Sequence, residues 1–185
     1  MKAAFYTLGC KVNQYETQIM EQEFRKAGFE IVDCEQEADA YIVNSCTVTG
    51  TGDRKSRQMV HRFRREHPSA VVALTGCFPQ AFPEQAACVL EADIVLGAAD
   101  RGGLLPSVLD ALDGKRVVHI TPHTPDEPFE PMMAEGMLDR TRAFVKIQDG
   151  CDNRCAYCVI PKARGFVRSK PLGDLARELE LLYGK

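Results

Sequence analysis

Three cysteines stand close together in the second half of the chain, in the motif Cys151-x-x-x-Cys155-x-x-Cys158. The motif directly follows a predicted strand, so the three thiols are expected to share one loop. Thiolates are the usual protein ligands of iron–sulfur clusters, and three of them leave one iron of a [4Fe–4S] cluster open for reaction. The alternatives are a zinc knuckle completed by a distant residue, or surface thiols. A four-cysteine zinc site would require a second local pair, and the sequence offers none nearby.

Three further cysteines are far apart in the sequence, but each directly follows a predicted strand. They are Cys10, Cys46 and Cys77. If their strands are neighbours in a parallel sheet, the three thiols meet at its carboxyl edge, where open α/β sheets keep their ligand crevice. Gly9 and Gly76 lack side chains and let the backbone pass close to a bulky cluster. The alternative is that these cysteines are small buried apolar residues, as free cysteine often is.

The elements that must position these thiols alternate between strand and helix over the first 120 or so residues. Strands are predicted at 3–8, 29–32, 40–44, 70–75 and 93–97, with an edge or linker strand at 115–121. Helices are predicted at 14–27, 52–67, 83–90 and 104–112. Apolar strands in this alternation predict the α/β class, with a parallel open sheet covered on both faces. The expected strand order is flavodoxin-like, 2-1-3-4-5.

The chain changes character after residue 121, which predicts three parts. Residues 1–121 form the cluster-binding first domain. Residues 122–140 read as an extended linker, because proline recurs there among acidic residues. Residues 141–185 hold a strand at 143–147, the cysteine loop and an amphipathic helix at 171–183 with apolar positions 172, 175, 179 and 182. One such βα unit cannot bury its own core, so we expect the start of a truncated second domain.

Composition favours an ordinary cytosolic protein. Apolar residues make up 45% of the chain, charged residues 26%, and the net charge is −3. The N-terminus does not resemble a secretory signal. No stretch approaches the roughly 20 apolar residues that span a membrane, so no membrane partner is expected. Disulfides are rare in a reducing compartment, which favours metal binding for the clustered cysteines. Cys34 and Cys88 lack a comparable placement, and we assign them no role.

The cysteine segments resemble those of a known family. DGCDNRCAYCVIPKARGFVRS resembles the cluster loop of radical S-adenosylmethionine enzymes, and YTLGCKVNQYET, NSCTVT and LTGC resemble the N-terminal signatures of its methylthiotransferase branch. The resemblance implies two [4Fe–4S] clusters on the six cysteines, S-adenosylmethionine as cofactor, and the first βα unit of a partial β/α barrel after the sheet. It also implies that Tyr157 lies near the adenine, and that Arg164 and Arg168 meet the cofactor or substrate. Solvated surface charge is the alternative for both arginines.

The resemblance also implies a reaction. GCKVNQYET is similar to the branch that transfers a methylthio group to C2 of threonylcarbamoyladenosine, next to the anticodon of tRNA. A 5′-deoxyadenosyl radical would abstract the C2 hydrogen, because no side-chain base removes an aromatic hydrogen. An external one-electron donor and a sulfur donor are required. The alternatives within the family are isopentenyladenosine of tRNA or a protein side chain. Because later barrel strands and the usual RNA-binding β domain are missing, we do not expect the 185-residue chain to turn over alone.

Two other classes of function remain open: a non-catalytic iron–sulfur or zinc module, and an RNA-binding or assembly fragment. The predicted helix at 52–67 is rich in basic residues, which suits the phosphates of tRNA, although a solvated helix face explains it equally well. Asn13 and Tyr15 either meet a flipped adenosine or serve as capping and packing residues. No residue is assigned a catalytic role, and the four histidines show no paired spacing. The basic residues of the predicted helix at 52–67 are Arg54, Lys55, Arg57, Arg62, Arg64 and Arg65.

Overall fold

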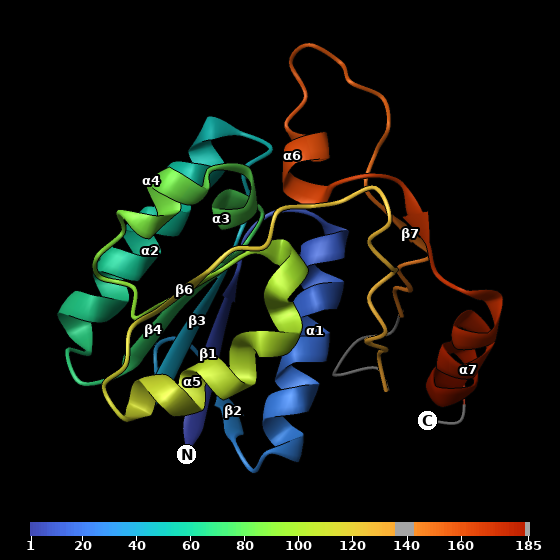
Figure 1. The fold of residues 1–185 in the computed structure, drawn as a ribbon. Helices are drawn as coiled ribbons and strands as arrows, with labels where there is room; N and C mark the ends of the chain where they lie inside the picture. The colour runs from blue at the N-terminus through green and yellow to red at the C-terminus, as the bar shows by residue number, and fades with distance from the viewer. Residues whose placement is uncertain (136–142, 184–185) are drawn as a thin grey trace.

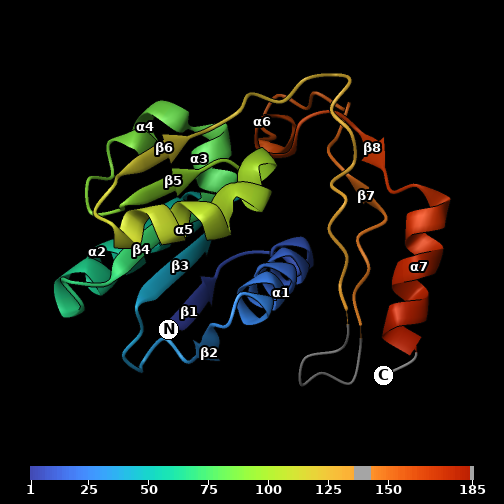
Figure 2. The ribbon, with the colours of Figure 1, turned by 60° about the horizontal axis from the view of Figure 1, so that its bottom comes forward.

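The computed structural model describes residues 1–135 and 143–183. Its main feature is a six-stranded parallel sheet in the order β2-β1-β3-β4-β5-β6, with helices on both faces (Figures 1 and 2). The predicted α/β class and flavodoxin-like order are therefore confirmed. The six strands are β1 (Lys2–Thr7), β2 (Glu30–Val32), β3 (Ala40–Ser45), β4 (Val71–Gly76), β5 (Ile94–Leu96) and β6 (Val117–His119). Strand β6 settles the choice left open at 115–121, because it pairs with β5 as an edge strand.

Two apolar cores hold the helices against the sheet. Helices α1 (Lys11–Lys26) and α5 (Leu104–Leu112) cover one face, where Phe24 and Leu104 are almost fully buried. Helix α2 (Gly50–Glu66) and the short helix α4 (Pro83–Ala87) cover the other, where Phe63 and Ala86 are fully buried. Strands β3 and β4 are buried along their whole length, which explains why their sequences are apolar without alternation.

The helix predicted at 83–90 begins at the predicted residue but ends earlier, at Ala87, and a helix that was not predicted precedes it. Helix α3 (Cys77–Ala81) begins directly at the end of β4, and α4 follows after Phe82. Proline has no N–H to continue a helix but fits well at the first helical position, so Pro83 ends one helix and begins the other. A 3₁₀ helix, η1 (Ala98–Gly103), was also not predicted. Because α3 begins directly after β4, Cys77 is the first residue of a helix.

The C-terminal segment, defined here as residues 143–183, differs from its prediction at the strand. No strand covers 143–147. Instead, β7 (Gln148–Asp149) pairs antiparallel with β8 (Arg168–Ser169). A strand requires a hydrogen-bonding partner, and in the described ranges β8 is the partner that β7 finds. Helix α6 (Ile160–Arg164) and helix α7 (Leu172–Tyr183) complete the segment.

The region predicted as a linker packs against the sheet domain. Residues 122–135 form no helix or strand, and 136–140 lie outside the described residues. Ala134 is 1% exposed in a small core with Tyr15, Ile19 and Leu182, so this region and α7 both pack on α1. Of the four predicted apolar positions of α7, Leu182 is buried, whereas Leu172 is 82% exposed. No helix in the described parts of the chain is long and apolar enough to cross a membrane.

Candidate functional site

The structure gathers the three dispersed cysteines at the carboxyl edge of the sheet. Cys10 caps the N-terminus of α1 after β1, Cys46 follows β3, and Cys77 begins α3 after β4. The side-chain oxygen of Asn13 lies 3.6 Å from Sγ of Cys10 and 3.8 Å from Sγ of Cys77. Residues that are 67 positions apart in the sequence therefore share one hydrogen-bond acceptor. We call this group the first cysteine site.

Gly9 brings Cys46 into the first cysteine site. Its φ of +103° lies in the region that favours glycine. A Cβ at Gly9 would lie 2.7 Å from Cβ and 2.8 Å from Sγ of Cys46. The end of β1 therefore passes directly against the Cys46 side chain, and any larger residue would displace it.

Asn13 is held in a fixed orientation at the centre of this site. Its side-chain nitrogen donates to the carbonyl of Leu8 at 2.9 Å and to that of Ser45 at 2.8 Å. The backbone carbonyl of Asn13 in turn accepts a hydrogen bond from the side chain of Asn44 at 3.0 Å. Because both amide hydrogens bond to backbone at the ends of β1 and β3, the side-chain oxygen must face the thiols. Asn13 is fully buried, which corresponds to the packing alternative rather than to nucleoside contact.

The three thiols differ in exposure. Cys10 is exposed, whereas Cys46 and Cys77 are 8% and 2% exposed. Burial raises the pKa of the Cys77 thiol, and the neighbouring Arg164 guanidinium opposes this by favouring the thiolate. The positive charge beside Cys77 comes from the C-terminal segment, which shows that this segment takes part in the first cysteine site.

The second cysteine site is the loop between β7 and α6. The backbone N–H of Cys158 donates to the carbonyl of Cys155 at 3.0 Å, which closes a turn, and the N–H of Cys151 donates to the carbonyl of Gly165 at 3.0 Å. Gly150 has a φ of +79°, and a Cβ there would lie 1.9 Å from the carbonyl oxygen of Phe166. The backbone segments before and after the motif are thus pressed together.

The surroundings of the second cysteine site are open. Cys155 is exposed, Cys151 and Cys158 are half-buried, and Tyr157 is 92% exposed. A cavity of about 300 Å³ beside Cys151 is lined in part by Arg154 and Phe166. The predicted contact of Tyr157 with adenine stays a prediction.

The side chains of neither site are arranged to bind one metal ion on its own. Within residues 1–135 and 143–183, no three histidine, cysteine, aspartate or glutamate side chains lie close enough to bind one ion. A cubane cluster makes a different demand, because each of its three thiolates binds a different iron. The thiols therefore need not converge on one point, and ligation by the six cysteines stays a prediction.

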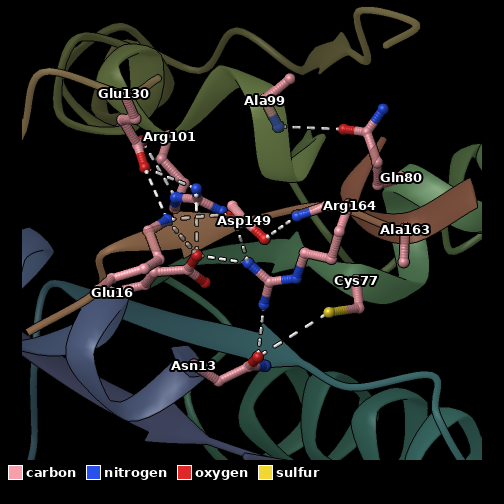
Figure 3. Close-up of polar contacts among 12 residues, drawn as sticks. Asn13, Glu16, Cys77, Gln80, Ala99, Arg101, Glu130, Asp149, Ala163 and Arg164 are labelled. Carbon is pink, nitrogen blue, oxygen red and sulfur yellow. Dashed lines mark hydrogen bonds and ion pairs between the residues drawn. The ribbon is translucent and has the colours of Figure 1, made fainter. Parts of the chain in front are cut away.

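Arg164 and Arg168 are not solvated surface charges, so that alternative is wrong for both. Arg164 is 5% exposed, and its Nη2 donates to the side-chain oxygen of Asn13 at 2.6 Å (Figure 3). Arg168 donates to the carbonyls of Arg164 and Phe166 at 2.6 and 3.1 Å and pairs with Glu127 at 3.4 Å. Both guanidinium groups bond to protein atoms, and their predicted contact with a cofactor stays a prediction.

A buried charge cluster joins the C-terminal segment to the rest of the chain. It has three acidic and three basic members, which are Glu16, Glu130, Asp149, Arg101, Lys146 and Arg164. Oε1 of Glu16 lies 3.1 Å from Arg101, 3.0 Å from Lys146 and in hydrogen-bond contact with Arg164 (Figure 3). Burial alone would raise the pKa of Glu16, but Arg101, Arg164 and Lys146 hold it well below its usual range.

No pattern of residue types or spacing indicated this cluster. Glu16 occupies an ordinary position of an amphipathic helix, and its partners lie 85 to 148 residues away. Polar residues on a helix are usually solvated, and only the tertiary structure shows that this one is 1% exposed.

The basic helix α2 divides into two halves. Arg62 and Arg65 pair with nearby glutamates, and Arg64 donates to the carbonyls of Pro68 and Ala70 at 2.8 and 3.0 Å and pairs with Asp93. Arg54 and Lys55, near the cysteine edge, are exposed. The exposed charges of this N-terminal half are available for an external anion.

The chain is similar to known proteins over nearly its whole length. A family model described as "Uncharacterized protein family UPF0004" matches residues 2–97. Threonylcarbamoyladenosine tRNA methylthiotransferase MtaB of Bacillus subtilis is 41% identical over 97% of this chain and 40% of its own length. Ribosomal protein uS12 methylthiotransferase RimO of Heliobacterium modesticaldum is 32% identical over 100% of this chain and 41% of its own length.

A solved structure has the same fold. It is the radical S-adenosylmethionine methyltransferase TsrM of Kitasatospora setae, with a TM-score of 0.57 at 16% identity, covering 97% of this chain and 45% of TsrM. The chain spans about two fifths of the length of the curated relatives described above.

Proposed function

Because this chain belongs to the radical S-adenosylmethionine methylthiotransferase family, we propose that its full-length protein transfers a methylthio group to C2 of threonylcarbamoyladenosine, next to the anticodon of tRNA, in the cytoplasm. The observation that carries the proposal is the gathering of three cysteines from three different strands around the Asn13 side chain. A cluster with three thiolate ligands requires its cysteines to be neighbours, and these three neighbours come from separate strands.

The residues of the first cysteine site fit a cluster. Its donors are thiols, and Gly9 leaves no side chain between the end of β1 and Cys46. The hydroxyls of Thr47, which follows Cys46, and Thr75, two residues before Cys77, are buried without a hydrogen-bond partner in the described residues. Buried hydroxyls normally find an acceptor, and the sulfides and thiolates of a cluster accept hydrogen bonds.

The second cysteine site also fits an iron–sulfur cluster, because a cofactor can reach it. Its loop is exposed and lies beside the cavity near Cys151, so a small molecule can reach it. When bound, a [4Fe–4S] cluster with S-adenosylmethionine on its open iron supplies the one-electron chemistry that removes a hydrogen atom from a strong C–H bond. We infer that Cys151, Cys155 and Cys158 hold that cluster, that Tyr157 packs on the adenine and that Arg168 orients the cofactor.

The remaining parts of the proposal concern partners. Arg54 and Lys55 lie near the cysteine edge and would contact backbone phosphates of tRNA. The electron comes from an external one-electron donor and the sulfur from a sulfur donor. Because the chain spans about two fifths of its curated relatives, turnover is assigned to the full-length protein.

Nucleoside mass spectrometry of tRNA from a deletion strain tests the proposal. We expect the methylthio form of threonylcarbamoyladenosine to disappear and to return with the wild-type gene. Variants with Cys10, Cys46 and Cys77 changed to Ala should not restore it, whereas the matched double variant Cys34→Ala and Cys88→Ala should. Unchanged tRNA together with loss of a methylthio group from a ribosomal protein would overturn the tRNA assignment.

A further inference from the structure

Arg164 contacts the first cysteine site, although it follows the second one in the sequence. Its Nη2 lies 2.6 Å from the side-chain oxygen of Asn13, and the same oxygen lies 3.6 and 3.8 Å from the sulfurs of Cys10 and Cys77. The side chain is 5% exposed. The guanidinium therefore lies in the immediate surroundings of thiols that belong to the other half of the chain (Figure 3).

The backbone next to Arg164 is tied to the second cysteine site. The carbonyl of Gly165 accepts a hydrogen bond from the N–H of Cys151 at 3.0 Å. Helix α6, which ends at Arg164, packs on α3, so that Ala163 is fully buried against Cys77 and Ala81. Two consecutive residues thus contact both sites, one through its side chain and the other through its carbonyl.

The two ends of the guanidinium have different partners. Nη1 pairs with Glu16, whose charge is also compensated by Arg101 and Lys146. Nη2 points to Asn13, which is neutral. Both carboxylates that pair with Arg164, Glu16 and, at 3.6 Å, Asp149, meet it at Nη1, so the Nη2 end that faces the cysteines bonds to a neutral group. A buried charge is weakly screened by solvent, and arginine keeps its proton at all ordinary pH values.

We propose that Arg164 is a positioning residue of the first cysteine site, which fixes the Asn13 side chain and favours reduction of the cluster held there. Reduction adds one electron to the cluster, and a positive charge beside it stabilises the more negative state. The inference rests on the proposed function, because it requires a cluster on Cys10, Cys46 and Cys77.

A redox titration of the first cluster alone tests this inference. The full-length protein with Cys151, Cys155 and Cys158 changed to Ala is reconstituted anaerobically and titrated with dithionite, followed by electron paramagnetic resonance. We expect Arg164→Gln to lower the midpoint potential. Arg164→Lys keeps the charge and should restore most of it. An unchanged potential in Arg164→Gln would overturn the inference.

Two control variants separate this role from a purely structural one. Tyr15→Phe removes two other hydrogen bonds between α1 and the C-terminal segment, one to Glu178 and one from Lys170. Lys162→Gln removes a positive charge from α6 itself, at a residue that is exposed. Both should keep the parental potential. A shift in either control as large as that of Arg164→Gln would overturn the inference, because docking or net charge would then explain it.

Iron content distinguishes failure of the inference from failure of the proposed function. If the Cys151, Cys155 and Cys158 variant is folded by circular dichroism but binds no iron, the first cluster does not exist and both proposals fail. If it binds about four irons and Arg164→Gln leaves the potential unchanged, only the role of Arg164 fails. Loss of the cluster from Arg164→Gln but not from Arg164→Lys or the controls supports the positioning role.

Discussion

The hydroxyl of Tyr15 donates a 2.5 Å hydrogen bond to Oε1 of Glu178, across 163 residues of the chain. Glu178 is fully buried, forms an ion pair with Lys170 and accepts the backbone N–H of Ala134 at 2.9 Å. Helix α1 of the sheet domain and helix α7 of the C-terminal segment are therefore joined by a polar group that water does not reach.

This arrangement predicts unequal effects of two substitutions on stability. Glu178→Ala leaves the Lys170 charge buried and unpaired, which costs about 3–5 kcal/mol. Tyr15→Phe removes two hydrogen bonds, one to Glu178 and one from Lys170 at 3.1 Å, but leaves the ion pair in place, and costs about 1–3 kcal/mol. Urea unfolding followed by circular dichroism measures both, with exposed Glu180→Ala as the control that should change little. Similar small losses for all three variants would contradict a compensated buried charge.

The buried charge cluster predicts loss of stability in acid. The folded pKa of Glu16 lies below its unfolded value, because Arg101, Arg164 and Lys146 outweigh the effect of burial. Its stabilising contribution is therefore complete above the unfolded value of about 4.3 and is lost as the pH falls toward the folded pKa. The free energy of unfolding should decrease as the pH drops below about 4.

Glu16→Gln should make this acid dependence shallower, since one coupled carboxylate is gone. Guanidinium unfolding at several pH values measures the slope. The exposed Glu84→Gln serves as the matched control and should reproduce the wild-type profile. A wild-type slope in Glu16→Gln would show that other carboxylates account for the acid sensitivity.

Gly9 and Gly28 form a matched pair for testing the first cysteine site. Both have positive φ, at +103° and +87°, but a Cβ at Gly28 meets nothing within 4 Å, whereas one at Gly9 collides with Cys46. Changing either to Ala should cost about 1–2 kcal/mol of backbone strain. Only Gly9→Ala should also lose about four of about eight irons in the full-length protein. Equal iron content in the two variants would argue against a cluster at Cys46.

Helix α2 predicts separate effects on RNA binding and on stability. Changing both Arg54 and Lys55 to Gln should weaken tRNA binding and reduce the slope of log affinity against log salt by about 1 per lost phosphate contact. Arg64→Gln should instead destabilise the fold by about 1–3 kcal/mol, because Arg64 bonds to Asp93 and to three backbone carbonyls. Fluorescence anisotropy and thermal unfolding separate the two. An unchanged salt slope in the double variant would refute the phosphate contact.

Runs of apolar residues, and glycines at the ends of helices, predicted most of the elements of the sheet domain. The strands that carry Cys10, Cys46 and Cys77 were placed to within a few residues, because a parallel strand buried on both faces is apolar along its length. Helix α3 was not predicted, since five residues with Pro79 among them show no helical period. Strand β7 was misplaced, because apolar residues at 143–147 do not reveal whether a partner strand lies beside them.

The polar centre of the site could not be predicted from the sequence. The period of a helix shows which residues face the core, but it does not identify the partner of a buried polar residue. Asn13 and Glu16 meet Arg164 across 151 and 148 residues. The packing of α6 on α3, together with the docking of the C-terminal segment on α1, brings these distant residues together.

The buried charge cluster has equal numbers of acidic and basic residues, and this balance limits which chimeras of related proteins can fold. Glu16 lies in the sheet domain, whereas Arg164 and Lys146 lie in the C-terminal segment. A chimera that joins this sheet domain to a C-terminal segment without those two cations would enclose a Glu16 carboxylate with Arg101 as its remaining cationic partner, which Glu130 also shares. Such grafts should fail unless position 16 is changed at the same time, so these positions are expected to have evolved as a unit.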